Sequence, residues 1–271
     1  MSLRIQTNIE AYDAHRNLVG TQKQLATAME RLSSGFRINR AADDAAGLAI
    51  SEKLHSQIGG LTQAQRNAQD AVSLVQTGEG ALAEVQSMLQ RVRDLAVQFN
   101  NGTLSASDQA AITAEVAQLC AEISDIGKQT SFNGISLLSG ATTITFQVGA
   151  NDNESMTVSS VSLFGAGTTY QVNSAIFAFT GAVSLASVDA AIQSVSNSRS
   201  TFGSVQNRLE HRLNNISTYQ ENLQASQSRI KDVDMASEMV NFTKLQILNQ
   251  AGTSMLAQAN SAPQSVLSLL R

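Results

Sequence analysis

Proline and aromatic residues are scarce in this sequence. Its 271 residues include one proline, Pro263, no tryptophan, and only 4% aromatic residues in all. Average usage would supply roughly 13 prolines. Because proline breaks the hydrogen-bond ladder of a helix, its scarcity permits long uninterrupted helices. The low aromatic content argues against an aromatic-rich globular core, and the alanine-rich hydrophobic fraction of 42% suits closely packed helices.

Residue types that carry metal or catalytic chemistry are equally scarce. The single cysteine, Cys120, excludes an intramolecular disulfide framework and a multi-cysteine metal site. We interpret it as a small hydrophobic residue on a helix. The three histidines, His15, His55 and His211, lie far apart, and none has a metal-ligand neighbour four residues on. The sequence therefore predicts no enzyme, no metal site and no cofactor.

Long apolar runs and an excess of positive charge are absent as well. No run approaches the ~18 apolar residues of a membrane span, and the opening MSLRIQTNIEAYDAHRNLVG lacks the apolar segment of a secretory signal peptide. The net charge of −4 and the isoelectric point near 5.4 are not typical of nucleic-acid-binding proteins. On these grounds alone we expect a soluble, cytoplasmic protein that binds neither nucleic acid nor membrane.

What the sequence does contain is a long apolar seam with heptad spacing. Its twelve positions alternate steps of three and four and are all non-polar: Leu61, Ala64, Ala68, Ala71, Val75, Gly78, Leu82, Val85, Leu89, Val92, Ala96 and Phe99. This pattern predicts a coiled-coil helix at about 44–99, with Asp43 and Asp44 as its N-cap and dipole partners. At 1.5 Å per residue the helix is roughly 80 Å long, so it requires partners along its length.

Two more long helices follow from the same kind of periodicity. A second apolar stripe predicts a helix at about 106–129, with Ser105 or Ser107 as its N-cap. The loop before it is short, so this helix is expected to run antiparallel to the first. A third stripe, interrupted by Arg199, predicts a helix at about 185–230.

Between the second and third helices the periodicity changes to two. Apolar and polar residues alternate over 144–148 and again over 156–158. This alternation predicts a β-hairpin within a region of short strands at about 141–181. The fold class is therefore mainly α: a rod of long antiparallel, coiled-coil helices, residues 41–230, with a small β-hairpin region.

Both ends of the chain carry apolar stripes that neither end can bury alone. The N-terminal stripe comprises Ile5, Ile9, Tyr12, Val19, Ala26, Met29, Leu32 and Phe36. A looser stripe near the C-terminus comprises Val233, Ala236, Val240, Ile247, Ala251, Ala262, Val266 and Leu269. Pairing of the two stripes is the expected solution, so 1–40 and 231–271 form one inner helical domain. Extended stripes of this kind favour an assembly protein, and a self-contained helical bundle is the alternative.

Several ordered motifs resemble those of bacterial flagellins. The longest is LSSGFRINRAADDAAGLAIS, from Leu32 to Ser51, which resembles the N-terminal signature of that family. Further matches are Ile5–Asn8, Gln90–Gln98, Gln129–Gly134, Phe146–Asn151 and Ala251–Asn260. The resemblance covers about 1–158 and 185–271. Only about 159–184 stands where larger relatives insert outer domains, which implies a short form and a slender filament.

The resemblance implies a structural subunit that polymerises with copies of itself into the flagellar filament for motility. The residues expected to make the polymerisation contacts are Ile5, Ile9, Leu32, Phe36, Val240, Ile247, Met255 and Leu269. The link between the inner domain and the rod is expected at Arg40, Asp43, Asp44 and Ser51. In the free subunit the termini are expected to be disordered, because each terminal helix buries too little until neighbours arrive.

Location and partners are also implied by the resemblance. It implies an extracellular filament protein that leaves through the flagellum's own type III export apparatus without a cleaved signal peptide. An export chaperone, cap proteins and junction proteins are the implied partners. Recognition by the innate immune receptor Toll-like receptor 5 is implied at Arg91, Leu95 and Glu115, with Asp94 in place of the glutamate of recognised relatives.

Three other functions are compatible with parts of this pattern. A hook–filament junction protein shares terminal patterns with flagellin, but the motifs at Gln90–Gln98 and Phe132–Gly134 argue against it. A cytoplasmic coiled-coil adaptor would stay monomeric or form a small closed oligomer. An enzymatic flagellin with a metalloprotease domain requires His-Glu-x-x-His, which this sequence lacks.

Overall fold

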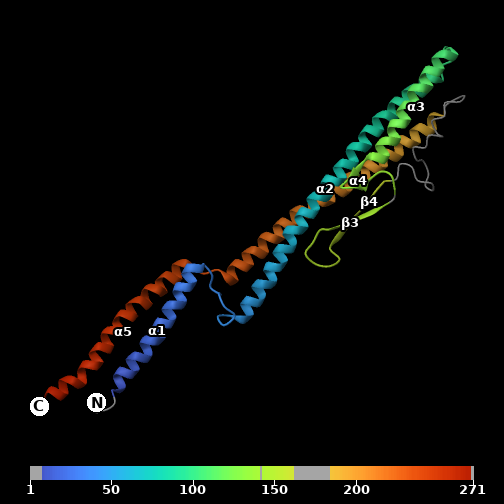
Figure 1. Cartoon of the computed structure of the whole chain (residues 1–271). Helices are drawn as coiled ribbons and strands as arrows, with labels where there is room; N and C mark the ends of the chain where they lie inside the picture. The colour runs from blue at the N-terminus through green and yellow to red at the C-terminus, as the bar shows by residue number, and fades with distance from the viewer. Residues whose placement is uncertain (1–7, 141, 162–183, 270–271) are drawn as a thin grey trace. The chain divides into compact units, whose positions relative to one another are not determined.

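Five helices and two small antiparallel hairpins make up the described chain (Figure 1). The computed structural model describes residues 8–140, 142–161 and 184–269, with side chains up to residue 261. The helices are α1 (Ile9–Ser34), α2 (Ala45–Phe99), α3 (Ala106–Gln129), α4 (Leu185–Lys231) and α5 (Met235–Leu269). The strands are β1 (Ser131–Phe132) paired with β2 (Ile135–Ser136), and β3 (Thr143–Gln147) paired with β4 (Ser155–Ser159). The mainly α fold class predicted from the sequence is confirmed.

The chain divides into two compact units. One combines the residues up to Ser56 with those from Asn222 onward, and we call it the terminal unit. The other comprises Gln57–Glu221, and we call it the middle unit. These boundaries lie within α2 and α4, so each of these long helices contributes to both units.

The core of the middle unit is built on the apolar seam of α2. Eleven of the twelve seam positions are buried, and Phe99 is partly buried against the same core. Residues of α3 and α4 that cover the seam are Ile112, Val116, Ile123, Val188, Val195, Phe202 and Leu209. Small seam residues allow close approach: a Cβ at Gly78 would lie 2.8 Å from Cε2 of the Phe202 ring. The predicted long seam helix and its need for partners are confirmed.

Polar pairs between α2 and α4 supplement the apolar core. Arg93 Nε lies 2.6 Å from Asp189 Oδ1. Arg199, which interrupts the predicted α4 stripe, donates through Nη1 to Gln86 Oε1 of α2 at 2.7 Å. Half-exposed pairs of this kind contribute at most about 1 kcal/mol each. They therefore help to align the two helices but do not dominate their packing.

Local signals set the helix starts as predicted, and local backbone geometry also explains the first hairpin. Asp44 Oδ1 accepts a hydrogen bond of 2.8 Å from a first-turn backbone N–H of α2, which is the N-cap role. Ser105 and Asp108 form a reciprocal capping box at the start of α3. Asn133 and Gly134 have φ angles of 50° and 79°, and positive φ at both positions is what a tight two-residue hairpin turn requires.

The second hairpin is attached to α2 and α4 through two backbone carbonyls at and just after the end of β3. Asn67 Nδ2 donates to Gln147 O at 3.0 Å, and Arg212 Nε donates to Val148 O at 3.1 Å. The hairpin side chains packed against the middle-unit core are Ile144, Phe146, Met156 and Val158. The predicted hairpin is confirmed, while residues 162–181 of the predicted strand region lie outside the described residues.

Candidate assembly surface on the terminal helices

Helices α1 and α5 lie side by side in the terminal unit, as the sequence predicts (Figure 1). Among the described residues of these two helices, Leu18, Ala28 and Leu245 are buried. Leu18 Cδ1 lies 3.1 Å from the position that a Cβ at Gly252 would take. Glycine at this position lets the helices approach closely, and few large side chains are covered by the contact.

A polar contact joins the start of α1 to α5. Asn8 caps α1, because its Oδ1 accepts from Ala11 N at 3.1 Å, and its Nδ2 donates to Ala259 O at 2.7 Å. In a regular helix that carbonyl accepts from the N–H four residues on, but this residue is Pro263, which has no N–H. Asn8 therefore satisfies a carbonyl that the proline leaves without its helical donor.

The N-terminal apolar stripe faces outward rather than toward α5. Its exposed described members are Ile9, Tyr12, Val19, Ala26, Met29 and Phe36. The pairing of the termini is confirmed, but the face of α1 that we assigned to it is wrong. The buried line of α1 runs through Leu18 and Ala28 instead. Leu18 of this line meets Gly252 of α5 at close range.

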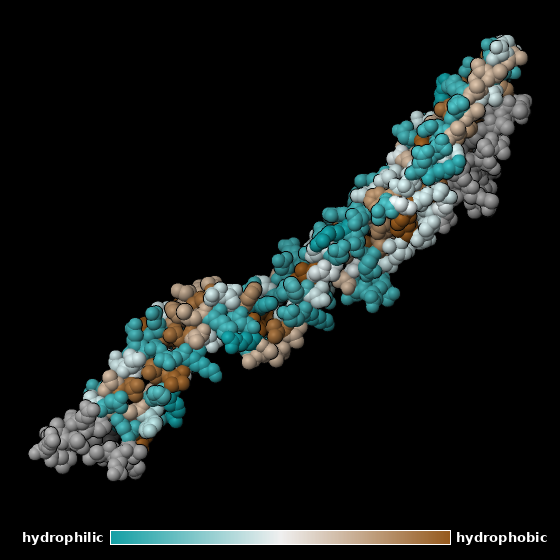
Figure 2. Space-filling view, in the orientation of Figure 1, coloured by the Kyte–Doolittle hydropathy of each residue, from teal (hydrophilic) through white to brown (hydrophobic). Residues whose placement is uncertain are grey.

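Large apolar side chains therefore remain exposed on both terminal helices (Figure 2). We call the following residues together the terminal apolar surface: Ile9, Tyr12, Val19, Met29, Phe36, Met235, Met239, Val240, Ile247, Leu248 and Met255. It includes five of the eight residues predicted to make polymerisation contacts. Of the other three, Leu32 is half-buried, and Ile5 and the side chain of Leu269 lie outside the described residues.

The segment after α1 is tied to the junction between α4 and α5 by backbone hydrogen bonds. Gly35 ends α1 with a φ of 76°, a left-handed conformation that suits glycine. Arg37 N donates to Lys231 O at 2.7 Å, and Val233 N donates to Gly35 O at 3.0 Å. The Lys231 ammonium lies 5.0 Å from the centroid of the Phe36 ring. Phe36 is thus engaged at this junction as well as partly exposed.

The residues predicted to link the inner domain to the rod make local contacts at the start of α2. The Asp43 carboxylate accepts from Arg40 N at 3.0 Å and from Asn39 N at 3.1 Å, and these bonds hold its pKa below the ordinary value. Asp44 caps α2, and the buried Ser51 hydroxyl donates to a carbonyl one turn earlier at 2.9 Å. Arg40 Nε also lies 3.1 Å from Glu30 Oε1 of α1. The four residues therefore contact the start of α2 and, through Arg40, the preceding helix, and their role as a link stays a prediction.

Two of the three predicted receptor-contact residues are accessible. Arg91 Nη2 lies 2.8 Å from Glu115 Oε1, and both side chains are exposed. Leu95 is buried in the core of the middle unit. Of the three residues, only Arg91 and Glu115 are therefore accessible to a partner.

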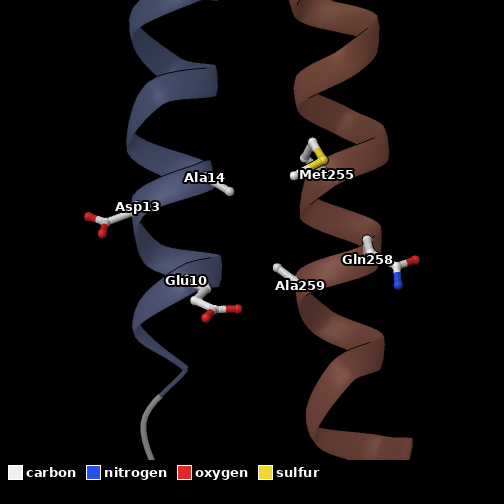
Figure 3. Close-up of a pocket in the computed structure, with 6 residues that line it drawn as sticks. All are labelled: Glu10, Asp13, Ala14, Met255, Gln258 and Ala259. Atoms are coloured by element: carbon white, nitrogen blue, oxygen red, sulfur yellow. The ribbon is translucent and has the colours of Figure 1, made fainter. Parts of the chain in front are cut away.

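Two shallow grooves run between α1 and α5. The first has a volume of about 400 Å³. Figure 3 shows Ala14 and Ala259 pointing toward one another across it, with Met255 one turn away on α5. The second, of about 360 Å³, is lined by Leu18, Gly252 and again Met255, among others. The first groove is also lined by the polar residues Glu10, Asp13 and Gln258, whereas small and apolar side chains dominate the second, which suits packing against another helix.

Metal binding and membrane insertion find no support in the part of the chain that the structure describes. No group of three or more His, Cys, Asp or Glu side chains there is placed to hold a metal ion. No described helix combines the length and the apolar character needed to cross a membrane.

Known proteins match this chain along nearly its whole length. Residues 5–143 match the family model of the bacterial flagellin N-terminal helical region, and 185–270 match that of the C-terminal helical region. The chain is 50% identical to a flagellin of Halalkalibacterium halodurans, over 98% of this chain and 99% of that one. It is 44% identical to the flagellar filament 33 kDa core protein of Treponema phagedenis, over 98% and 99% of the two chains. Identity to a flagellin of Bacillus subtilis is 45%, over 99% and 100%.

Proposed function

The chain belongs to the bacterial flagellin family, and we propose that copies of it polymerise through the terminal apolar surface. It is accordingly a structural subunit of the flagellar filament and not an enzyme, and its place is the extracellular flagellum. The relatives reported above are flagellins and a filament core protein. They favour a filament subunit over a junction protein or a cytoplasmic adaptor.

The observation that carries the proposal is the contrast between the two units. Of the fifteen exposed large apolar residues in the described chain, twelve belong to the terminal unit and three to the middle unit. In the middle unit the seams of α2, α3 and α4 cover one another. In the terminal unit side chains such as Val240 and Ile247 remain 71% and 62% exposed. Burial of one such side chain contributes about 1.5–3 kcal/mol before the costs of association.

The distribution of this surface over two helices favours an open assembly. Exposed apolar residues lie on both α1 and α5, so a patch on one helix can pack against a different patch on the other helix of the next copy. Contacts between unlike patches are heterologous, and they propagate into a helical polymer when the rotation between copies does not close a ring. A filament of many copies then buries surface that a single copy leaves in water.

Val240→Glu tests this surface with one charge. The side chain of Val240 is 71% exposed in the single copy, so the new carboxylate is solvated there and the fold is expected to persist. At a contact between copies the carboxylate would be buried without a partner, which costs several kcal/mol. We therefore expect no filaments from Val240→Glu at about a hundred times the critical concentration of the parent chain.

Val240→Leu is the matched control, because it changes the same position but keeps an apolar side chain. Both variants should show the parent's helical content by circular dichroism, and only Val240→Leu should form filaments in seeded assays followed by electron microscopy and sedimentation. An unchanged critical concentration for Val240→Glu would refute the proposed surface. Removal of residues 231–271 should likewise leave a soluble chain that does not polymerise.

The proposal also concerns the export of the free subunit and the proteins that bind it on the way. A free subunit with an exposed apolar surface is prone to aggregation, which supports a need for an export chaperone until copies meet. We propose that this chaperone covers part of the terminal apolar surface during type III export without a cleaved signal peptide, and that cap and junction proteins contact the same helices. If so, chaperone binding is lost in Val240→Glu, and undiminished binding would place the chaperone elsewhere.

Recognition by Toll-like receptor 5 is the second candidate function. It is supported by the exposure of Arg91 and Glu115 and by their ion pair of 2.8 Å, which presents a defined polar feature on α2 and α3. The double variant Arg91→Ala/Glu115→Ala should weaken receptor signalling by about tenfold or more in reporter cells. Glu122→Ala, which changes another exposed residue of α3, is the control, and an equal effect of the two variants would contradict the assignment.

A further inference from the structure

The methionines of this chain differ in exposure between the two units. In the terminal unit the exposed fractions are 56% for Met29, 48% for Met235, 50% for Met239 and 65% for Met255. In the middle unit Met88 and Met156 are partly buried and pack against the hydrophobic core. All four methionines described in the terminal unit thus belong to the terminal apolar surface, and their sulfur atoms sit on accessible side chains.

Met255 has a special position among them. It lines both grooves between α1 and α5, and Ala14 is also shared by the two. Figure 3 shows the short side chains of Ala14 and Ala259 on the two sides of the first groove. A side chain of a neighbouring copy that enters either groove therefore meets the thioether of Met255. Flexible, polarisable thioethers suit such irregular apolar contacts.

We propose that Met255, together with Met29, Met235 and Met239, is an oxidation site through which peroxides block the assembly of free subunits. This inference rests on the proposed function, because it needs these side chains at contacts between copies. In the reaction the peroxide transfers one oxygen to the thioether sulfur. The O–O bond breaks, an S–O bond forms, the sulfur loses two electrons, and hydrogen peroxide is reduced to water. The product is a polar sulfoxide in place of an apolar side chain.

The consequence differs between free and assembled subunits. In a free subunit the sulfoxide oxygen is solvated, so the fold is not disturbed. In a contact between copies this oxygen is buried without a donor, and each such burial should raise the critical concentration about tenfold. In an existing filament the same thioethers are covered and react slowly. Peroxide should therefore stop growth while leaving assembled filaments intact.

Peptide mass spectrometry of the full-length subunit after treatment with hydrogen peroxide tests the first step. The four methionines of the terminal unit should be oxidised about ten times faster than Met88 and Met156, which serve as internal controls because they are packed against the core. Filaments treated in the same way should show slower oxidation of these four methionines. Equal rates for all six methionines in the free subunit, or equal rates in subunit and filament, would contradict the proposal.

The effect on assembly is measured as the critical concentration in seeded growth. Oxidised subunits should show an increase of about tenfold or more, with unchanged helical content. Treatment with methionine sulfoxide reductase and a dithiol should reverse it, since the sulfoxide oxygen leaves as water while the dithiol becomes a disulfide. Met255→Gln, which places a polar side chain at the same site, should raise the critical concentration without any oxidant.

Leucine variants distinguish the effect of oxidation at these four methionines from the effect of oxidation at other residues. The quadruple variant with Met29, Met235, Met239 and Met255 changed to leucine should assemble and should be insensitive to peroxide. If it does not assemble, the single Met255→Leu variant takes its place and should lose most of the sensitivity. Loss of assembly after oxidation that is equal in parent and leucine variants would overturn the inference, as would oxidised parent subunits that assemble normally. Failure of the proposed function is recognised separately, by filaments of Val240→Glu.

Discussion

Gly78 marks a point where α2 and α4 leave little room between them. A Cβ at Gly78 would lie 2.8 Å from Cε2, 3.4 Å from Cζ and 3.6 Å from Cδ2 of the Phe202 ring. Phe202 is buried, so its ring cannot move out into solvent. We therefore expect Gly78→Ala to force a shift of the ring or of the helices, and to destabilise the middle unit.

Two opposing effects set the size of this change. Replacing glycine by alanine within a helix stabilises it by about 1 kcal/mol. Placing an extra methyl group in a packed core costs about 1–3 kcal/mol. Gly80 is exposed and has nothing within 4 Å of its Cβ position, so Gly80→Ala shows the first effect alone. The free energy of unfolding should therefore differ between Gly78→Ala and Gly80→Ala by about 1–3 kcal/mol.

Urea unfolding followed by circular dichroism measures this difference, and hydrogen exchange of the α2 amides assigns it to the middle unit. Adding Phe202→Leu shortens the side chain that meets the new methyl group. Gly78→Ala should then cost less, and the two substitutions should be coupled by about 1–3 kcal/mol. An equal gain in stability from Gly78→Ala and Gly80→Ala would refute the reasoning, because the contact with Phe202 would then impose no cost.

Other predictions concern single groups with defined partners. Asn8→Asp keeps the cap of α1 but replaces the donor to Ala259 O by a carboxylate, so local hydrogen exchange should reveal a loss of about 1–2 kcal/mol; unchanged exchange contradicts this. Burial raises the pKa of the Cys120 thiol to about 11. At about pH 8 iodoacetamide should therefore modify the folded chain roughly a hundred times more slowly than the urea-unfolded chain. The contribution of the protonated Cys120 thiol to the stability of the fold should be lost as the pH rises from 9 toward 11. Hydrogen bonds from the Ser105 hydroxyl and backbone hold the pKa of Asp108 below 3.8. Protection of the first turn of α3 should thus be lost only as the pH falls below this value, and Asp108→Asn should remove that acid dependence.

The sequence predicted a structural feature correctly where its signal is local or where the feature lies on one side of a single helix. The seam from Leu61 to Phe99 predicted burial correctly, because its steps of three and four put every position on one side of α2. The capping pair at Ser105 involves neighbours within three residues, so no tertiary knowledge was needed. The partner of Arg199, which interrupts the α4 stripe, was not predicted because Gln86 lies far away in sequence.

Contacts that depend on tertiary placement were not predictable in the same way. Leu95 follows two exposed arginines, Arg91 and Arg93, yet it is buried because this part of α2 packs in the core of the middle unit. The contact between Asn8 and Ala259 joins residues 251 positions apart. In hindsight Pro263 was the available signal, since a proline in a helix always leaves one carbonyl in need of another donor.

The outward face of α1 shows why periodicity alone could not assign its partner. An apolar stripe indicates that a side of a helix is to be covered, but not whether the cover comes from the same chain or from another copy. Here Leu18 of α1 meets Gly252 of α5, where the glycine permits close approach but buries little apolar area. The larger side chains, Tyr12 and Met255 among them, stay in water. Apolar stabilisation grows with the area buried, so these helices gain most of their stabilising free energy only when copies pack together. We therefore expect their strongest protection from hydrogen exchange in the filament and not in the free subunit.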